Sequence, residues 1–209
     1  MLAFVRFLVW CLATLLFKIR IVGAENIPKQ GAGLIVSNHV SYADAILIGY
    51  ATPRFIRFLM WQPLYENRWL NWFSRLFLAI PVSENSPKEA LRALRQARAE
   101  LKKGMLVGVF PEGGITRTSR LEPFERGVEV ISRGLESTPV IPVYLDGLWG
   151  HAFSLKGGRV FSSPLKLRHK VTVYIGEPIT GIVDAVSLRE RVLELGALAG
   201  ADRLQCVIE

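Results

Sequence analysis

The chain has 209 residues, half of them apolar, so it is long and hydrophobic enough to bury the core of one domain, and global disorder is excluded. Its 26 Lys and Arg outnumber 18 Asp and Glu, and the net charge of +8 favours an anionic partner, either nucleic acid or an anionic bilayer surface. A positive mean hydropathy with five Trp and eleven Phe, without a recognition motif for nucleic acid, favours the lipid surface.

Residues 1–20, MLAFVRFLVWCLATLLFKIR, are predicted to form a helix that lies in the membrane interface or dips into one leaflet. Arg6 interrupts the apolar run, and the segment that follows it is about half as long as the roughly 20 residues that a spanning helix needs. No small-residue cleavage site follows, which argues against a signal peptide. The alternative is a core helix of a soluble domain. Residues 21–209 contain no repeat or linker and are predicted to form one domain.

Short apolar runs bounded by turn-forming residues predict four strands, over residues 31–38, 105–110, 139–145 and 171–175. The first predicted helix has Ser41 as its N-cap and ends near Tyr50. A second helix opens with the capping box SPKE at 86–89 and stops at Gly104, and a third opens at Ser187. Strands that alternate with helices indicate an α/β fold with a largely parallel central sheet flanked by helices.

Residues 54–81 carry three Trp, four Phe and four Arg with a single acidic residue, a composition typical of a membrane interface. The alternative is a pair of core helices with surface arginines. We favour membrane contact, because Trp61, Trp69 and Trp72 are too large to be buried together easily.

A histidine and a carboxylate follow the first predicted strand, in the segment NHVSYAD at 38–44. Imidazole is the side chain best suited to accept a proton near neutral pH. With Ser41 as the N-cap, Asp44 occupies the third helical position, and its side chain points back toward His39. Asp44 is therefore predicted to bind one imidazole nitrogen and to leave the other free as a general base. The alternative is that Asp44 only completes a capping box and that His39 is an ordinary loop residue.

A second polar loop follows the strand at 105–110, in the segment FPEGGITR at 110–117. The paired glycines Gly113 and Gly114 let a ligand approach the backbone closely, and the guanidinium of Arg117 matches the geometry of a phosphate. Ligands of open parallel sheets bind outside the carboxyl ends of the strands, so we expect both loops at one edge. Together they predict a base beside an anion site, whereas either loop alone fits an ordinary turn.

The order of these segments resembles the glycerolipid acyltransferase family, the 1-acylglycerol-3-phosphate acyltransferases and their relatives. The pattern N-H-x-x-x-x-D is followed about seventy residues later by F-P-E-G. The run VIPV at 140–143 resembles the last motif of that family, and the resemblance extends over 34–147. In motif form the chain looks most like the acyltransferase domains of bacterial 2-acylglycerophosphoethanolamine acyltransferase and related fusion proteins.

Two positions depart from the family pattern. Thr-Arg usually follows F-P-E-G directly, but here Gly114 and Ile115 intervene before Thr116 and Arg117. The second motif usually ends in an arginine, which is missing from the run IPVS at 80–83. Arg54, Arg57 and Arg75 are the candidates to replace it.

The resemblance implies a glycerol-3-phosphate acyltransferase-like fold, with the acyltransferase domain at 21–209. It implies transfer of a fatty-acyl group from acyl-CoA or acyl-carrier protein to the free hydroxyl of a lysophospholipid or 1-acylglycerol-3-phosphate. Residue by residue, it implies His39 as the general base and Asp44 as its partner. For the glycerophosphate site it implies the loop of Glu112 and Gly113, and the chemistry of Gly114 and Arg117 adds these two residues to the predicted substrate-binding set.

We expect neither a metal nor a cofactor, because the sequence has no metal-ligand cluster, P-loop or G-x-S-x-G elbow. Cys11 and Cys206 stand at opposite ends of the chain, so no disulfide framework is expected. His151 and His169 are isolated and are predicted to be structural. The expected location is the cytoplasmic face of the cell inner membrane, as a peripheral or monotopic protein. A thioester or ester hydrolase and a catalytically silent lipid-binding module are the alternative functions, and nucleic acid is not an expected partner.

Overall fold

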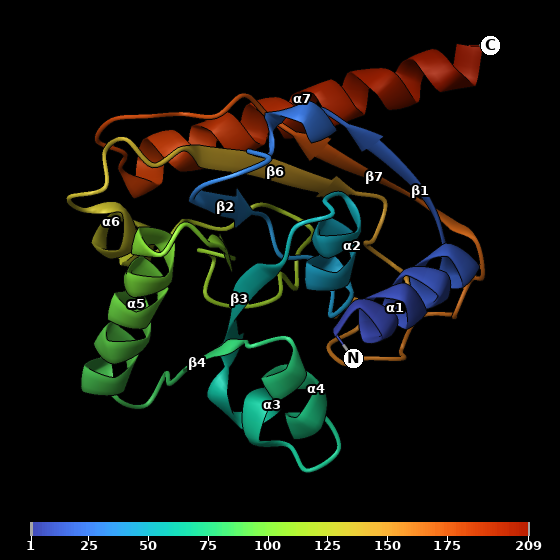
Figure 1. Cartoon of the computed structure of the whole chain (residues 1–209). Helices are drawn as coiled ribbons and strands as arrows, with labels where there is room; N and C mark the ends of the chain where they lie inside the picture. The colour runs from blue at the N-terminus through green and yellow to red at the C-terminus, as the bar shows by residue number, and fades with distance from the viewer. Residues whose placement is uncertain (1, 209) are drawn as a thin grey trace.

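One central sheet of seven strands organises the computed structural model (Figure 1). The structure describes the backbone of residues 2–208 and the side chains of residues 6–202 except residue 8. The strands are β1 (Phe17–Val22), β2 (Gly33–Ser37), β3 (Ile56–Trp61), β4 (Ile80–Val82), β5 (Leu106–Val109), β6 (Val140–Asp146) and β7 (His169–Ile175). Their spatial order is β1-β7-β6-β2-β5-β3-β4, and every neighbouring pair is parallel except β6 and β7. The predicted largely parallel sheet is confirmed.

Helices cover both faces of this sheet. They are α1 (Leu2–Leu16), the 3-10 helix η1 (Ala24–Asn26), α2 (Asp44–Tyr50), α3 (Gln62–Glu66), α4 (Asn71–Leu76), α5 (Pro87–Lys102), α6 (Gly127–Ser132) and α7 (Ala185–Ile208). Buried residues of α2, such as Leu47, pack into the core on one face. Ala97 of α5, Val128 of α6 and Val192 of α7 pack into the core on the other face. This arrangement matches the predicted flanking helices.

The four predicted strands are present as β2, β5, β6 and β7, but three further strands were not predicted. β1 lies in the segment that was assigned to the N-terminal helix. Its residues alternate between the core and the solvent, from buried Phe17 to exposed Lys18, and this alternation is the pattern of a strand. Residues 17–20 therefore belong to the sheet, where they pair with β7. β4 is an edge strand, a position that tolerates Pro81.

The helix starts were predicted with mixed success. Ser86 caps α5 as predicted, because its hydroxyl accepts a hydrogen bond from the Glu89 amide at 3.3 Å. The predicted cap at Ser41 is wrong, since α2 begins at Asp44 after a turn. The C-terminal helix begins at Ala185 and not at Ser187, because the carboxylate of the preceding residue, Asp184, accepts the first free amides of the helix.

Helix α1 has one packed side and one exposed side. Trp10 stacks on Tyr50 of α2 with ring centroids 5.6 Å apart, and the Arg6 guanidinium donates to backbone carbonyls beyond α2. Phe7 and Leu15 are exposed. Among the described residues, no helix is both long enough and apolar enough to cross a bilayer. Cys11 carries a free thiol, and the side chain of Cys206 lies outside the described residues.

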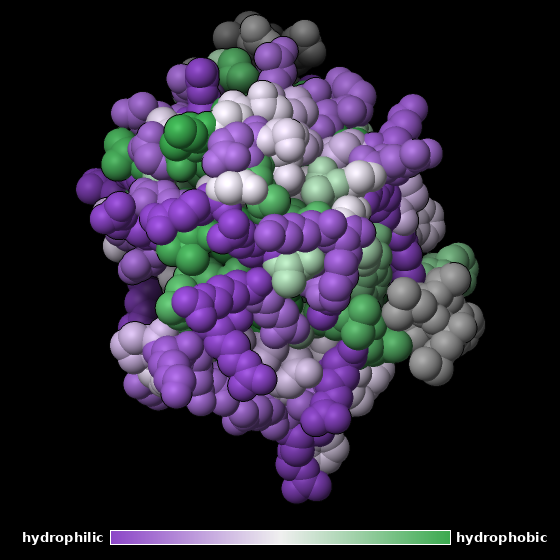
Figure 2. All heavy atoms as spheres, turned by 60° about the vertical axis from the view of Figure 1, so that its left-hand side comes forward, coloured by the Kyte–Doolittle hydropathy of each residue, from purple (hydrophilic) through white to green (hydrophobic). Residues whose placement is uncertain are grey.

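The aromatic segment at 54–81 forms β3, α3, α4 and β4, so the alternative of two core helices is wrong. Trp69 and Trp72 are 73% and 63% exposed, and Trp61 is also exposed. The Arg68 guanidinium lies over the Trp69 ring at 5.0 Å. The face that carries α5 and α6 has a different character: turned toward the viewer in Figure 2, it is mainly hydrophilic.

Candidate active site

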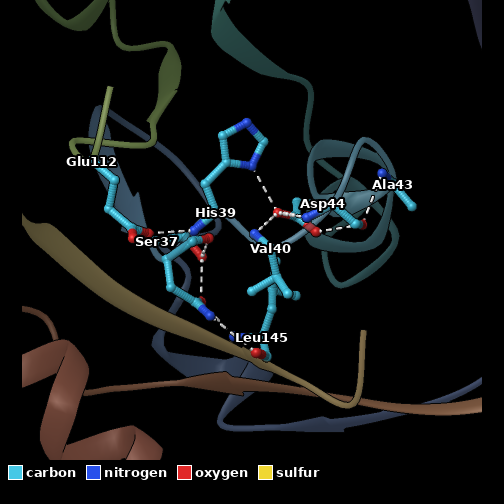
Figure 3. Close-up of polar contacts among 9 residues, drawn as sticks. Ser37, His39, Val40, Ala43, Asp44, Glu112 and Leu145 are labelled. Carbon is cyan, nitrogen blue, oxygen red and sulfur yellow. Dashed lines mark hydrogen bonds and ion pairs between the residues drawn. The ribbon is translucent and has the colours of Figure 1, made fainter. Parts of the chain in front are cut away.

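His39 and Asp44 meet at the carboxyl end of β2 (Figure 3). Asp44 Oδ2 lies 2.8 Å from His39 Nδ1, as the sequence predicted. Asp44 is fully buried, whereas the His39 side chain is 20% exposed. With Nδ1 donating to the carboxylate, the neutral ring carries its lone pair on Nε2, which points away from Asp44 in Figure 3. The geometry is that of an oriented base, and the catalytic roles of both residues remain predictions.

A tight turn, and not a capping box, brings the carboxylate to the ring. Asp44 is the first residue of α2, and its Oδ2 also accepts the amides of Val40 at 2.6 Å and Ser41 at 2.9 Å. The Ser41 hydroxyl donates to Oδ1 at 2.8 Å. A buried carboxylate is costly unless hydrogen bonds satisfy it. These donors therefore hold Asp44 in one orientation, and through it the plane of the His39 ring.

The two predicted loops lie at the same edge of the sheet and are hydrogen-bonded to each other. The His39 amide donates to Glu112 Oε1 at 2.6 Å, across 73 residues of sequence. The Thr116 amide donates to the His39 carbonyl at 2.8 Å. The backbone of His39 is thus fixed on both sides by the second loop.

Glu112 links the loops and does not point outward as a free ligand. Its other oxygen, Oε2, accepts the Glu122 amide at 2.9 Å. Burial raises the pKa of this carboxyl, and the amides of Glu122 and His39 oppose that shift. Within the predicted substrate site, Glu112 therefore supports the position of His39.

The other predicted substrate-binding residues are exposed on the second loop. Gly113 has φ +76°, a left-handed conformation that favours glycine, and a Cβ added at Gly114 would meet open space. Arg117 is exposed and follows Thr116, the residue that is hydrogen-bonded to the His39 carbonyl. An anion could therefore approach the backbone at Gly114 without meeting a side chain. The guanidinium of Arg117, the residue after Thr116, would be available to bind it.

Two of the three arginines that could replace the missing arginine of the second motif make structural contacts away from His39. Arg54 donates to the carbonyls of Pro28, Gly31 and Gly104, which precede β2 and β5, at the edge opposite His39. Arg57 pairs with Glu100 of α5 and donates to a backbone carbonyl. Arg75 is exposed on α4. Neither Arg54 nor Arg57 therefore takes the place of that arginine at the site.

An aromatic stack behind His39 was not foreseen. The His39 ring lies on Phe110 with centroids 4.0 Å apart and an interplanar angle of 13°. Phe110 in turn stacks on Phe58 of β3 at 5.7 Å. A Cβ at Gly108 would come within 2.3 Å of the Phe58 ring, so only glycine leaves room for it. Phe110 thus covers one face of the His39 ring, while Asp44 holds the ring at Nδ1. No local pattern in the sequence could have paired these residues, because they come from three separate segments.

Asn38 is a second residue whose role was not foreseen. Its amide nitrogen donates to the Leu145 carbonyl at 3.1 Å, and its Oδ1 accepts the Leu145 amide at 2.7 Å. Two hydrogen bonds to the backbone of β6 thus anchor the residue before His39. The sequence feature that could have indicated this role is the position of Asn38 directly before His39 in the pattern N-H-x-x-x-x-D.

The other two histidines lie elsewhere and bind backbone carbonyls. His151 is fully buried with Nε2 3.2 Å from the Lys166 carbonyl, and burial lowers its pKa. Nε2 of His169 lies 2.6 Å from the Gly147 carbonyl. Both arrangements are those of structural side chains.

An apolar pocket, partly open to solvent, lies beside Phe58 of the aromatic stack. Its walls come from α1, α2, β3 and α4, including Trp10, Ile46, Gly49, Phe58 and Phe73. Phe58 belongs to both the pocket wall and the stack under His39. The pocket therefore shares one wall residue with the aromatic stack that supports His39.

Known proteins share this sequence pattern and this fold. A sequence model of the Acyltransferase family matches residues 18–146, which include both loops. Over 162 residues the chain is 27% identical to the 1-acyl-sn-glycerol-3-phosphate acyltransferase of Bacillus subtilis (strain 168), a match that covers 77% of this chain and 73% of that protein. Over 132 residues it is 27% identical to the chloroplastic 1-acyl-sn-glycerol-3-phosphate acyltransferase BAT2 of Brassica napus, where the match covers 63% of this chain and 38% of that protein.

A solved structure is similar over nearly the whole chain. The crystal structure of the 1-acyl-sn-glycerophosphate (LPA) acyltransferase PlsC from Thermotoga maritima aligns with a TM-score of 0.71 and 26% identity, over 98% of this chain and 81% of that chain. The family match covers more than half of the chain and both candidate loops. The chain therefore belongs to the glycerolipid acyltransferase family.

Proposed function

We propose that this protein transfers a fatty-acyl group from the thioester of acyl-CoA or acyl-carrier protein to the free hydroxyl of a lysophospholipid, with 1-acylglycerol-3-phosphate as the first candidate acceptor. The observation that carries the proposal is the His39 imidazole, oriented by a buried carboxylate at 2.8 Å beside a glycine-lined loop. The relatives from Bacillus subtilis and Thermotoga maritima are named for the same acceptor, which supports this proposal.

In the proposed reaction, His39 Nε2 takes the proton of the acceptor hydroxyl as its oxygen attacks the thioester carbonyl. The carbon–oxygen ester bond forms, the carbon–sulfur bond breaks, and the thiolate leaves with the electron pair. A thiolate is a good leaving group because its conjugate acid has a pKa of about 8.5, taking cysteine as the reference. Asp44 holds the ring and stabilises the imidazolium that forms, which then returns the proton to the thiolate. The reaction needs no covalent enzyme intermediate, metal or cofactor.

The acceptor phosphate is proposed to bind the loop that follows β5. Gly113 and Gly114 allow close approach to the backbone, and Arg117 supplies an exposed guanidinium. The hydrogen bond between Thr116 and His39 links this loop to the base. A phosphate bound there would lie on the same loop pair as the base that takes the hydroxyl proton.

The acyl chain is proposed to lie in the apolar pocket that ends at Phe58. Gly49 of α2 lines this pocket, and a Cβ built on it meets nothing within 4 Å, so a leucine there would extend into free space. We expect Gly49→Leu to lower the rate with long-chain donors by at least roughly tenfold relative to short-chain donors, because a methylene that no longer fits costs roughly 10–200-fold in selectivity. The measurement is kcat/KM across a series of acyl-CoA chain lengths.

Gly200→Leu is the matched control for this variant, because Gly200 in α7 also has open space around its Cβ position and lies outside the pocket. Its chain-length profile should match that of the unmodified protein. If Gly49→Leu and Gly200→Leu share one profile, the acyl chain lies elsewhere.

The same pocket suggests how the protein meets its lipid substrate. α1 and α4 form two of its walls. α1 displays Phe7 outward, α4 displays Trp72, and Trp69 is exposed in the turn before α4. Trp at the edge of an apolar surface, with Arg68 beside it, is typical of a bilayer interface. We propose that α1 and the segment from α3 to α4 rest on an anionic membrane surface, at the cytoplasmic face of the inner membrane.

A direct assay tests the proposed function. The purified protein is incubated with labelled acyl-CoA or acyl-carrier protein and a panel of lysolipids, and products are separated as diacyl lipid and free fatty acid. We expect diacyl lipid, with the highest rate for 1-acylglycerol-3-phosphate. Free fatty acid without acceptor dependence would instead identify a hydrolase, and absence of both products together with binding of a lysolipid would identify a silent lipid-binding module.

A further inference from the structure

A strongly basic loop between β6 and β7 has no part in the chemistry described so far. Residues 155–168, the basic loop, contain four cations, Lys156, Arg159, Lys166 and Arg168, and no acidic residue. They supply four of the eight net positive charges of the chain. All four are exposed, and within the described part of the chain none forms an ion pair with a carboxylate. The loop therefore presents uncompensated charge to the surroundings.

Large apolar side chains alternate with these cations. Phe161, Leu165 and Leu167 are 69%, 53% and 62% exposed. Phe161 has φ +62°, an uncommon conformation for a bulky residue that costs free energy. A solvated surface loop would not need three exposed apolar residues, one of them in a strained backbone. Cations interleaved with exposed Phe and Leu are instead the composition of a surface that binds the headgroup region of a bilayer.

The basic loop is anchored to the core in a defined position. The Phe161 amide donates to the Ala152 carbonyl at 2.8 Å, and its ring meets Phe153 edge-on at 5.8 Å. Phe153 in turn packs against Phe17, the residue that follows α1, at 6.4 Å. The exposed apolar side chains are therefore held on a fixed backbone, which residues 152 and 153 anchor to the core.

The anchor of the basic loop lies next to both the active-site turn and α1. The Phe153 carbonyl accepts the Tyr42 amide at 3.1 Å, and Ser154 pairs with Ser41 in a β-bridge. In Figure 1 the loop, drawn in orange, runs beside α1. It thus adjoins α1 and the turn that carries His39, unlike the hydrophilic α5 surface of Figure 2.

We propose that the basic loop is a separate binding site for anionic phospholipid headgroups, with Phe161, Leu165 and Leu167 entering the boundary between headgroups and acyl chains. Cations near an anionic leaflet gain on the order of fivefold in partition each, so four cations together account for on the order of a hundredfold or more. The apolar side chains add an attraction that does not depend on lipid charge. This site does not depend on the proposed acyl transfer.

The test compares two charge-matched variants of the full chain by cosedimentation with vesicles of phosphatidylcholine, alone or mixed with phosphatidylglycerol. The loop variant carries Lys156→Gln, Arg159→Gln, Lys166→Gln and Arg168→Gln. The control variant removes four exposed cations from α5 by Lys88→Gln, Arg92→Gln, Arg95→Gln and Lys102→Gln. We expect the loop variant to lose on the order of 100-fold in partition onto phosphatidylglycerol vesicles, and the control to lose far less.

Equal losses in the two variants would show that net charge alone matters and would overturn the proposal, as would no loss in either. Phe161→Ser should weaken partition onto both kinds of vesicle, and unchanged partition would remove the apolar side chains from the site. If the loop variant binds vesicles normally but loses transfer from acyl-carrier protein alone, the loop docks an acidic protein, and the lipid proposal is overturned.

Acyl transfer to a detergent-dispersed acceptor separates this proposal from the proposed function. The loop variant should retain that activity and its melting temperature, because the substituted side chains lie on the surface. Loss of the detergent activity in the loop variant alone would place the loop in the catalytic machinery and overturn the proposal. If the unmodified protein shows no transfer at all, the vesicle comparison still tests the basic loop.

Discussion

His39→Ala is expected to reduce acyl transfer by about 10²–10⁴-fold, the contribution of a positioned general base. The variant removes the Nε2 lone pair that is proposed to accept the hydroxyl proton, while the backbone at position 39 keeps its hydrogen bonds to Glu112 and Thr116. The measurement is kcat/KM with saturating donor and the preferred lysolipid. Vesicle binding and the melting temperature should stay close to those of the unmodified protein, because the side chain is only one partner of the aromatic stack.

His169→Ala is the matched control, because it also removes an imidazole with one hydrogen-bond partner, the Gly147 carbonyl, and one ring contact, with His151 at 5.2 Å. Its activity should fall by no more than a few-fold, as expected for the loss of about 1 kcal/mol of hydrogen bonding outside the site. Transfer by His39→Ala at the rate of the unmodified protein would remove His39 from the mechanism. Equal losses in His39→Ala and His169→Ala would point to a general loss of structure.

Asp44→Asn is expected to lower acyl transfer by at least about 10²-fold while the fold is retained. The asparagine oxygen can take the place of Oδ2 and accept from His39, Val40 and Ser41. Its amide can donate to the Ser41 hydroxyl, which donates to Oδ1 in the present structure. The substitution therefore removes the negative charge that is proposed to stabilise the imidazolium and leaves the hydrogen-bond geometry in place.

A double variant makes this prediction sharper. If His39 and Asp44 act as one unit, Asp44→Asn combined with His39→Ala should be no slower than His39→Ala alone, because the carboxylate has nothing left to orient. Additive losses would mean that Asp44 acts independently of the histidine. Full activity in Asp44→Asn would restore the alternative in which the carboxylate only stabilises the turn before α2.

Much of the fold follows from short patterns in the chain. The apolar runs that became β2, β5, β6 and β7 are bounded by turn residues, and the capping box at Ser86 opens α5 as expected. β1 and β3 were missed because they lie in segments whose composition was interpreted as interfacial. In β1 the alternation of buried and exposed residues was visible in the sequence, but an apolar helix of similar composition precedes it directly.

The candidate site divides in the same way. His39 and Asp44 are five residues apart, so the local chain can join them, and the sequence predicted their contact although it misplaced the helix start. The hydrogen bond from His39 to Glu112 joins residues 73 apart. The sequence predicted only that the two loops lie at one edge of the sheet, because the carboxyl ends of parallel strands lie together. It did not predict the hydrogen bond between them.

The sequence by itself determined the α/β class, the positions of the four main strands along the chain and the pair of loops that bear the family pattern, because these depend on side-chain periodicity and on residues a few positions apart. Only the tertiary structure decided which groups surround the imidazole and where a hydrocarbon chain can lie. Phe58, Gly108 and Phe110 form the support of His39 from two strands and a loop, and four separate elements enclose the pocket. Such contacts arise from packing between segments that are distant in the chain, and local propensity carries no record of them.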